Sequence, residues 1–146
     1  LGGRVVCADD FFLRPEQRTP ERLAEPGGNL DRERMKSEVI DRLSADALSY
    51  TPFDCGVMDF GSPVELPPAR LTIVEGAYSL HPYFGEYYDL AVFVTADLET
   101  RLARIGARPG HNNVEMFRKR WIPMEERYLS ACEVEARSNL VIDTTK

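Results

Sequence analysis

The sequence is poor in the residues that build disulfide frameworks and metal clusters. Its 146 residues hold three cysteines, widely spaced and odd in number, and two histidines. No CxxC pair occurs, so neither a disulfide scaffold nor a zinc site is indicated. His81 and His111 form no cluster with cysteines or acids, which argues against a metal role for either. This cysteine usage favours a reducing, cytoplasmic compartment.

Long apolar runs are absent as well. No stretch approaches the ~20 apolar residues of a membrane-spanning helix, and residues 1–8 are too short for a signal peptide. An apolar content of 43% and a charged content of 29% are ordinary for a globular protein. We therefore expect a single domain over residues 1–146, with a core of its own and no membrane partner.

Positive residues are fewer than negative ones, 18 against 24, and six of them lie in one short segment. The net charge of −6 argues against a nucleic-acid partner. Residues 101–120 nevertheless contain five Arg, one Lys and one Glu, a local charge of +5 that leaves −11 for the rest of the chain. This asymmetry favours a local anion site within the segment.

Four apolar, mostly β-branched stretches predict strands, and they lie at 4–8, 70–76, 89–96 and 139–145. Apolar spacing predicts helices between them, at 31–43, 98–105 and 114–136, the last kinked at Pro123. Asp31 and Asp97 suit the N-caps of the first two. Residues 13–30 are rich in Pro, Gly and charge and predict a loop, and 50–68 predict short extended pieces. Alternating strands and helices indicate an α/β fold, a parallel sheet with helices on both faces.

Acidic residues follow two of the four predicted strands. Asp9 and Asp10 come directly after the first strand, and Glu75 ends the second before a glycine. Ligands of open α/β sheets bind beyond the carboxyl ends of the strands, so we expect chemistry here. Strand-end acids can also simply face water, and the residues alone leave both roles open.

Six motifs recur in one order along the chain, and together they resemble the uridine-kinase-like P-loop kinases, a group near phosphoribulokinase and bacterial pantothenate kinase. The motifs are ADDFF, NLD, YTPFDC, IVEGAY, DLAVFVTADLETRLARI and WIPMEERY. The resemblance implies a P-loop NTPase fold of the nucleoside-kinase type with a five-stranded parallel sheet. It also implies transfer of the ATP γ-phosphate, with Mg²⁺, to a hydroxyl of a small molecule, most often a nucleoside such as uridine.

One part of the resembling family has no counterpart in this sequence. Its first strand, the GxxxxGK[ST] phosphate loop and the following helix would precede Leu1, and no segment here matches GxxxxGK[ST]. Leu1-Gly2-Gly3 also reads as the end of a helix with its glycine cap. We therefore expect a kinase-like domain that is incomplete at its N-terminus, and no kinase activity from a chain that begins at Leu1.

The resemblance assigns the reacting groups. Asp9 matches the acid that meets the substrate hydroxyl, as base and as a direct or water-mediated Mg²⁺ ligand, and Glu75 matches the Mg²⁺-linked acid. Asp10 is expected to be structural. Arg101, Arg104 and Arg108 lie three and four residues apart on one helical face and match phosphate-binding arginines. An ordinary solvated face is the alternative for these arginines. The break at GARPGHNN suits a lid within about 101–120.

The substrate side follows from the same resemblance. Positions near the nucleoside in relatives are matched by Phe12, Glu25, Phe53 and Asp54, although core packing is an alternative role for both phenylalanines. Where uridine kinases have a base-reading histidine, this chain has Met58, which weakens the case for a pyrimidine.

Two functions remain open from sequence. The first is a small-molecule kinase of this group. The second is a non-catalytic metabolite-binding or regulatory module that has lost phosphate binding. The sequence leaves the oligomeric state open, a homo-oligomer included.

Overall fold

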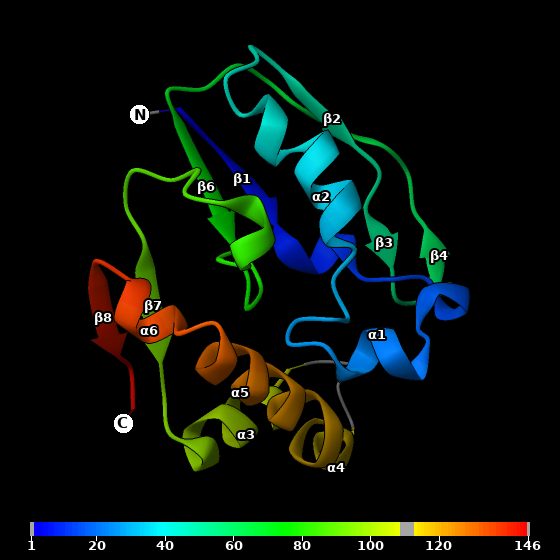
Figure 1. The fold of residues 1–146 in the computed structure, drawn as a ribbon, viewed down its shortest axis with the longest axis vertical. Coiled ribbons are helices and arrows are strands. Elements are labelled where there is room, and N and C mark those ends of the chain that lie inside the picture. Colours follow the sequence, from blue (N-terminus) through cyan, green and yellow to red (C-terminus); the bar gives the residue numbers. More distant parts are fainter. Residues whose placement is uncertain (1, 109–112, 146) are drawn as a thin grey trace. The chain divides into compact units, whose positions relative to one another are not determined.

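The structure is a computed structural model, and it describes residues 2–108 and 113–145 (Figure 1). It divides into two compact units, the first ending at Tyr87 and the second beginning at Tyr88. Each unit is described by itself below.

The described strands form four two-stranded ladders, two parallel and two antiparallel. In the first unit β1 pairs with β6, β2 with β5, and β3 with β4; in the second, β7 pairs with β8. The strands are β1 Gly3–Cys7, β2 Leu48–Tyr50, β3 Phe53–Asp54, β4 Asp59–Phe60, β5 Val64–Leu66, β6 Leu71–Glu75, β7 Val92–Thr95 and β8 Leu140–Asp143.

The parallel ladder of β1 and β6 is the frame of the first unit. Its register places Gly3 opposite Leu71 and Cys7 opposite Glu75, so both strands end at the same level. Parallel neighbours need a long crossover, and the segment between them carries α2 and the two antiparallel hairpins. The predicted strands at 4–8 and 70–76 are thereby confirmed.

A buried arginine of β1 binds the chain that packs against this ladder. Arg4 is 4% exposed, and its guanidinium donates to the carbonyl oxygens of Leu43 (2.7 Å), Ala45 (3.2 Å) and Asp46 (3.3 Å). Its Nε also donates to the Thr72 hydroxyl at 2.9 Å. Arg4 therefore joins β1 and β6 to the chain that follows α2.

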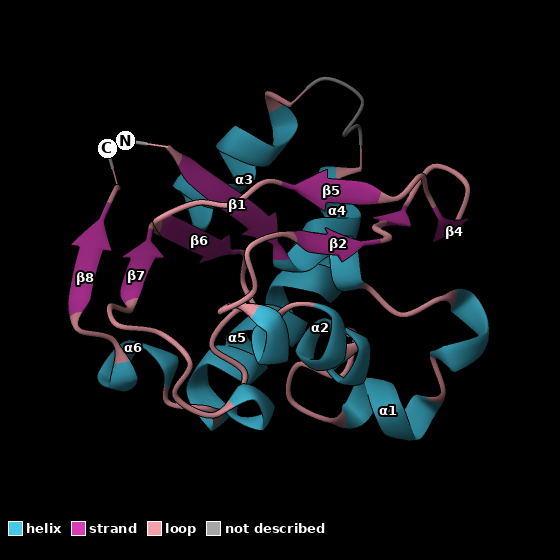
Figure 2. Ribbon diagram, turned by 90° about the horizontal axis from the view of Figure 1, so that it is seen from above, coloured by secondary structure: helices cyan, strands magenta, loops and turns pink. Residues whose placement is uncertain are grey.

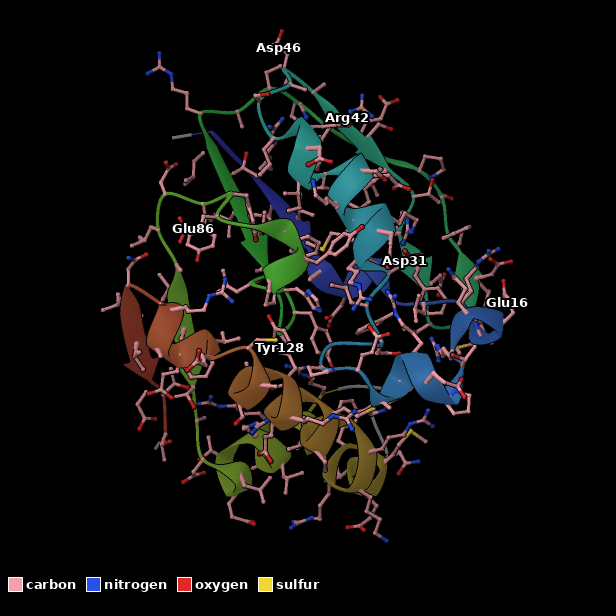
Figure 3. The ribbon with its side chains drawn as sticks, viewed as in Figure 1. Glu16, Asp31, Arg42, Asp46, Glu86 and Tyr128 are labelled. Atoms are coloured by element: carbon pink, nitrogen blue, oxygen red, sulfur yellow. The ribbon has the colours of Figure 1, made fainter. Side chains whose placement is uncertain are left out.

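Helix α2, Arg32–Glu38, forms as the sequence predicts, although it is shorter. Asp31 lies at the N-terminus of this helix (Figure 3). Its carboxylate accepts the backbone N–H of Arg34 at 3.1 Å. The apolar positions Met35, Val39 and Ile40 are buried. A 3₁₀ turn, Ile40–Arg42, continues the chain after the helix ends.

The predicted loop at 13–30 is wrong in part, because it contains a 3₁₀ turn, Pro15–Gln17, and a short helix, α1 Pro20–Ala24. Thr19 caps α1 by accepting the backbone N–H of Arg22 (3.1 Å), and Pro20 occupies the first turn, where its missing N–H costs nothing. Proline and threonine thus mark a helix start here.

Residues 48–66 form the two antiparallel pairs of the first unit, in agreement with the short extended pieces expected there. Figure 2 shows β2 and β5 lying side by side in opposite directions. In the shorter pair Phe53 faces Phe60 and Asp54 faces Asp59. The turn of this β3–β4 hairpin contains Met58 in a left-handed conformation, with φ 59°.

The second unit pairs β7 with β8 in parallel and packs helices beside them (Figures 1 and 2). Its buried cluster joins Leu102 and Ile105 of α3 to Ile122 of α5. Leu98, the first residue of α3, is 40% exposed. The helices are α3 Leu98–Gly106, α4 Val114–Met116, α5 Ile122–Ala131 and α6 Val134–Arg137.

The helix kink predicted at Pro123 corresponds to a π-helical turn just before this proline. A π-helical turn, Phe117–Trp121, connects α4 to α5, and the backbone N–H of Ile122 donates to the Phe117 carbonyl oxygen. Pro123 has no N–H to continue the ladder, so the irregularity falls just before it. Glu133, at φ 50°, separates α5 from α6, and the predicted single helix therefore ends early.

Candidate functional site

The two strand-end acids meet at one edge of the β1–β6 ladder. Asp9 lies in the 3₁₀ turn Ala8–Phe11 that follows β1, and Glu75 is the last residue of β6. Because Cys7 and Glu75 are directly paired, the turn with Asp9 begins beside Glu75. Both carboxylate residues are exposed. The structure thus brings together the two acids that sequence reasoning selected.

Gly76 makes this close approach possible. Its φ is +118°, and a Cβ built on it would lie 2.9 Å from the Cβ of Ala8. A side chain would collide with the start of the Asp9 turn and would also strain the backbone. The glycine after Glu75 therefore lets the ends of β1 and β6 stay in contact.

The Cys7 thiol interacts with both acidic residues. Burial is the main cause that raises the pKa of Cys7 to about 12, and a hydrogen bond with the Glu75 carboxylate is the second. The backbone of Asp9 bonds to the same sulfur and opposes the shift, while the charges of Asp9 and Glu75 add to it. The thiol stays protonated and can hold the Glu75 carboxylate in place.

Asp10, unlike Asp9, is bonded within the unit. Its carboxylate accepts the Tyr50 hydroxyl at 2.9 Å, and burial together with this bond raises the pKa of Tyr50. The carbonyl oxygen of Asp10 accepts an N–H of Arg34 at 2.9 Å. These contacts agree with the structural role expected for Asp10.

Arg34 anchors the Asp9 turn, and sequence reasoning missed it. Its guanidinium carbon lies 4.5 Å from the ring centroid of Phe11 and 4.8 Å from that of Phe60. A second N–H donates to the carbonyl oxygen of Thr51 at 2.5 Å. The guanidinium therefore ties the turn to the β3–β4 hairpin. A single arginine on a predicted helix gives no indication in the sequence of such contacts with the turn and the hairpin.

The β3–β4 hairpin places two predicted substrate residues near Asp9. Strand β3 packs on the Ala8–Phe11 turn. The charges of Asp9 and Asp54 both act on Cys55, where burial is the main cause of a raised thiol pKa. Phe53 is only 5% exposed, so most of its side chain is core. The Asp54 carboxylate accepts the backbone N–H of Gly56 at 2.7 Å and shapes the turn.

The other two predicted substrate residues have local partners. Phe12 is half-buried and forms an isolated backbone bridge with Leu30. The Glu25 carboxylate forms an ion pair with Arg32 at 2.7 Å, and Arg32 also lies over the Tyr83 ring. A substrate at Glu25 would have to compete with this pair.

The carboxylates of Asp9 and Glu75 suit a magnesium ion that is bound partly by the phosphates of a nucleotide. Within the described residues, no three His, Cys, Asp or Glu side chains cluster closely enough to bind a metal by themselves. Mg²⁺ commonly takes one or two carboxylates and completes its shell with phosphate oxygens and water. Asp9 and Glu75, adjacent and exposed, fit this mode of binding.

The three arginines predicted to bind phosphate lie in the second unit. Arg101 forms ion pairs with Glu125 (3.0 Å) and Glu126 (3.1 Å) of α5. Arg104 donates to the hydroxyl (2.9 Å) and the carbonyl oxygen (2.7 Å) of Thr144, after β8.

Arg108 is exposed just beyond the end of α3. The middle of the expected lid, residues 109–112, lies outside the described residues, and so does His111.

Two further arginines of the first unit were missed by sequence reasoning. Arg14 lies over the ring of Phe60, and Arg18 lies over the ring of Phe53. They are four residues apart in RPEQR, a stretch predicted to be a loop. In a loop, a separation of four residues does not predict that two side chains lie on the same side. Only the fold shows that they share an aromatic surface.

Comparison with known proteins identifies the fold. No protein-family model and no curated protein sequence matches the chain. Among solved structures it is similar to a possible uridine kinase from Bacillus stearothermophilus, with a TM-score of 0.71 and 18% identity over 97% of this chain and 72% of that one. It is also similar to a protein described as a fructose transport system kinase from Silicibacter sp. TM1040, with a TM-score of 0.63 and 19% identity over 95% and 74%.

These likenesses confirm the fold class expected from sequence. The chain has an α/β fold similar to that of these two structures. Of the helices in the ranges 2–108 and 113–145, none is both long and apolar enough to cross a membrane.

Proposed function

We propose that the protein is a small-molecule kinase that transfers the γ-phosphoryl group of ATP to a hydroxyl. One observation carries the proposal: Asp9, just after β1, and Glu75, at the end of β6, lie at the same edge of two directly paired parallel strands, in a fold similar to that of two proteins described as kinases. Phosphoryl transfer depends on positioning and charge stabilisation, which two acids at a strand-end edge can supply.

The chain's residues have separate tasks in this proposal. Asp9 orients the acceptor hydroxyl and takes its proton as the oxygen attacks the γ-phosphorus and the bond to the β-phosphate oxygen breaks, releasing ADP. Glu75, held by the Cys7 thiol, is a ligand for Mg²⁺. The ion, when bound, neutralises charge on the phosphates.

The phosphate-binding role proposed for Arg101, Arg104 and Arg108 requires a change of partners for two of them. Arg101 would exchange its carboxylates for phosphate oxygens, and Arg104 would exchange Thr144. A guanidinium can make such an exchange because its planar donors fit carboxylate and phosphate oxygens alike.

The acceptor proposed from the fold is a small hydroxylated molecule, with a nucleoside such as uridine as one candidate. One structural neighbour is described as a possible uridine kinase and the other as a putative fructose transport system kinase. Met58 lies in the turn of the β3–β4 hairpin. Uridine kinases have a base-reading histidine at the matching position, so its replacement by methionine makes a pyrimidine acceptor less favoured.

A non-catalytic binding module is the second candidate, because the sequence has no GxxxxGK[ST] to cradle nucleotide phosphates. It would bind a metabolite without turnover. The retained pair of acids favours the kinase, since metabolite binding alone does not require a metal-binding carboxylate.

The test is phosphoryl transfer by the protein expressed from its full reading frame, with Mg-ATP and a panel of nucleosides, pantothenate and sugar derivatives. Asp9→Asn should lower kcat by about 10²–10⁴-fold, the usual contribution of a positioned base. The matched control, Asp46→Asn, changes an exposed carboxylate at the far end of the ladder and should turn over normally. Near-normal turnover by a folded Asp9→Asn variant would exclude Asp9 as the base, and metabolite binding without any transfer would favour the second candidate.

A further inference from the structure

One guanidinium group contacts two segments of the first unit that are distant in the chain. Arg34, on α2, donates to the Asp10 carbonyl oxygen in the 3₁₀ turn after β1 (2.9 Å) and to the Thr51 carbonyl oxygen just before β3 (2.5 Å). Its guanidinium carbon lies 4.5 Å from the Phe11 ring centroid and 4.8 Å from that of Phe60. The turn and the β3–β4 hairpin segment thus each contribute one carbonyl oxygen and one ring to the same side chain.

Arg34 is fixed by acids at both ends of its own helix. Its side chain is 12% exposed, and it forms ion pairs with Asp31 (3.7 Å) and Glu38 (3.4 Å). Burial lowers the pKa of Arg34, and the charges of Glu38, Asp31 and Asp10 oppose that shift. The guanidinium stays charged because an arginine cannot lose its proton near neutral pH. Helix α2 therefore holds a cation to which the turn and the hairpin are bound.

The two segments that Arg34 joins carry different parts of the proposed reaction. The turn contains Asp9, the proposed base, and β3 contains Phe53 and Asp54, two of the predicted acceptor residues. Strand β3 also packs directly on the turn. Because Asp10 follows Asp9, the bond from Arg34 to the Asp10 carbonyl oxygen fixes the backbone one residue away from the base. The relation between base and acceptor hairpin thus depends on one side chain.

The contacts of Arg34 require the shape of a guanidinium as well as its charge. The planar group carries five N–H donors in a fixed fork, and its flat face stacks on aromatic rings. A lysine ammonium keeps the charge, but it has its three donors on one nitrogen and no flat face to place on Phe11 and Phe60. Replacement by lysine should therefore loosen the turn and the hairpin from α2 while it leaves the local charge unchanged.

We propose that Arg34 is a positioning residue for the phosphoryl transfer, which sets the distance and direction between Asp9 and an acceptor bound at the β3–β4 hairpin. This rests on the proposed function for the roles of Asp9 and the hairpin. Transfer rates respond strongly to such geometry, since a misplacement of about 1 Å can cost about a hundredfold. Arg34 acts through the turn that carries Asp9 and touches neither ATP nor the transferred group.

The test is a double-mutant cycle of Arg34→Lys and Asp9→Asn in the protein from its full reading frame. Turnover is measured with radiolabelled Mg-ATP and the nucleoside, pantothenate or sugar derivative that the unaltered protein phosphorylates fastest. Arg34→Lys alone should lower kcat by about ten- to a hundredfold and raise the KM for the acceptor, with an unchanged KM for ATP. In the Asp9→Asn background, the same lysine should lower kcat by less than about twofold, because the group that Arg34 positions is already gone.

A second measurement needs no turnover. The backbone N–H of Asp31 donates to the Phe11 carbonyl oxygen at 2.7 Å, and that of Gly61 donates to the Pro52 carbonyl oxygen at 2.8 Å. The first bond reports the place of the turn and the second that of the hairpin. Both amides should exchange hydrogen about tenfold faster in Arg34→Lys, the usual effect of losing a charge-assisted bond.

Two further variants separate positioning from stability. Arg4→Met removes another buried arginine of this unit, whose bonds go to Thr72 and to the chain after α2. Under conditions where it is folded, it should keep kcat and both KM values within about twofold. If Arg34→Lys does not fold, Phe60→Leu removes the ring on the hairpin side and keeps apolar bulk. It should lower kcat in the same direction, again only when Asp9 is present.

Two results would overturn the inference. One is normal turnover and normal exchange in a folded Arg34→Lys variant. The other is a loss of kcat that is equally large with and without Asp9, since that would show a general structural effect. If the unaltered protein transfers no phosphoryl group, the kinase proposal fails, whereas faster exchange in Arg34→Lys would still support Arg34 as the residue that joins the turn to the hairpin.

Discussion

Adjacent residues after β1 have unlike surroundings. Asp10 accepts a hydrogen bond from Tyr50, whereas Asp9 is exposed at the edge where β6 ends with Glu75. The 3₁₀ turn causes the difference, because successive side chains of a turn point in different directions. A structural role for Asp10 could be expected from sequence, but its partner, 40 residues away, could not.

At the residue scale, we predict that Gly76→Ala destabilises the protein by about 1–3 kcal/mol. Two costs add together, a positive φ and a contact of 2.9 Å with Ala8. Gly85→Ala is the matched control, since Gly85 has φ +67° but open space around its Cβ position. Urea unfolding monitored by circular dichroism measures both, and equal losses would contradict the close contact at Gly76.

Elements of the first unit depend on single polar side chains as much as on apolar packing. Arg4 forms one hydrogen bond with β6 and three with the chain after α2, and so joins the β1–β6 ladder to that chain. Its position in an otherwise apolar strand gave no sign of this role. Strand and helix periodicity identified the elements, and the buried arginine determines how they are joined.

At the element scale, Arg4→Met should lower the free energy of unfolding by about 2–4 kcal/mol. The methionine keeps apolar bulk but leaves three carbonyl oxygens without their donors, and unsatisfied buried groups cost about 1–3 kcal/mol each before relaxation and water entry reduce the sum. Arg42→Met, at an exposed site, should change stability by less than about 0.5 kcal/mol. A loss at Arg4 no larger than that of the control would show that water replaces these bonds.

The whole molecule exposes an unusual amount of apolar strand surface. Eight such strand residues of the described ranges are at least 40% exposed: Val5, Leu71, Ile73, Val92, Val94, Leu140, Val141 and Ile142. Parallel strands are normally covered on both faces, and exposed apolar strand surface promotes association. Covering this surface would contribute roughly 25 cal/mol per Å² buried.

At the scale of the whole molecule, we predict that the 146-residue chain self-associates as its concentration rises. The double variant Ile73→Thr/Val94→Thr should reduce association because it removes apolar area from one exposed strand in each unit. Sedimentation velocity over a concentration series measures this. A variant with unchanged sedimentation behaviour would show that other surfaces mediate the association.

Much of the fold was accessible from sequence because local patterns encode it. The strands at 4–8, 70–76, 89–96 and 139–145 and the helix capped by Asp31 were found by apolar period and capping chemistry. The errors arose where local signals conflict. Thr19 and Pro20 start a helix inside a stretch rich in loop formers, and Glu133 interrupts a helical pattern without a glycine or proline.

The sequence by itself determined the fold class and located acids at the ends of two predicted strands, because strand period and strand-end chemistry are local properties. Only the tertiary structure decided which side chains meet across long separations. The register that sets Cys7 beside Glu75, the collision that requires Gly76, and the hairpin that gathers Arg14 and Arg18 over two rings all join residues distant in the chain. Such contacts depend on how elements pack, and no periodicity within a single element encodes them.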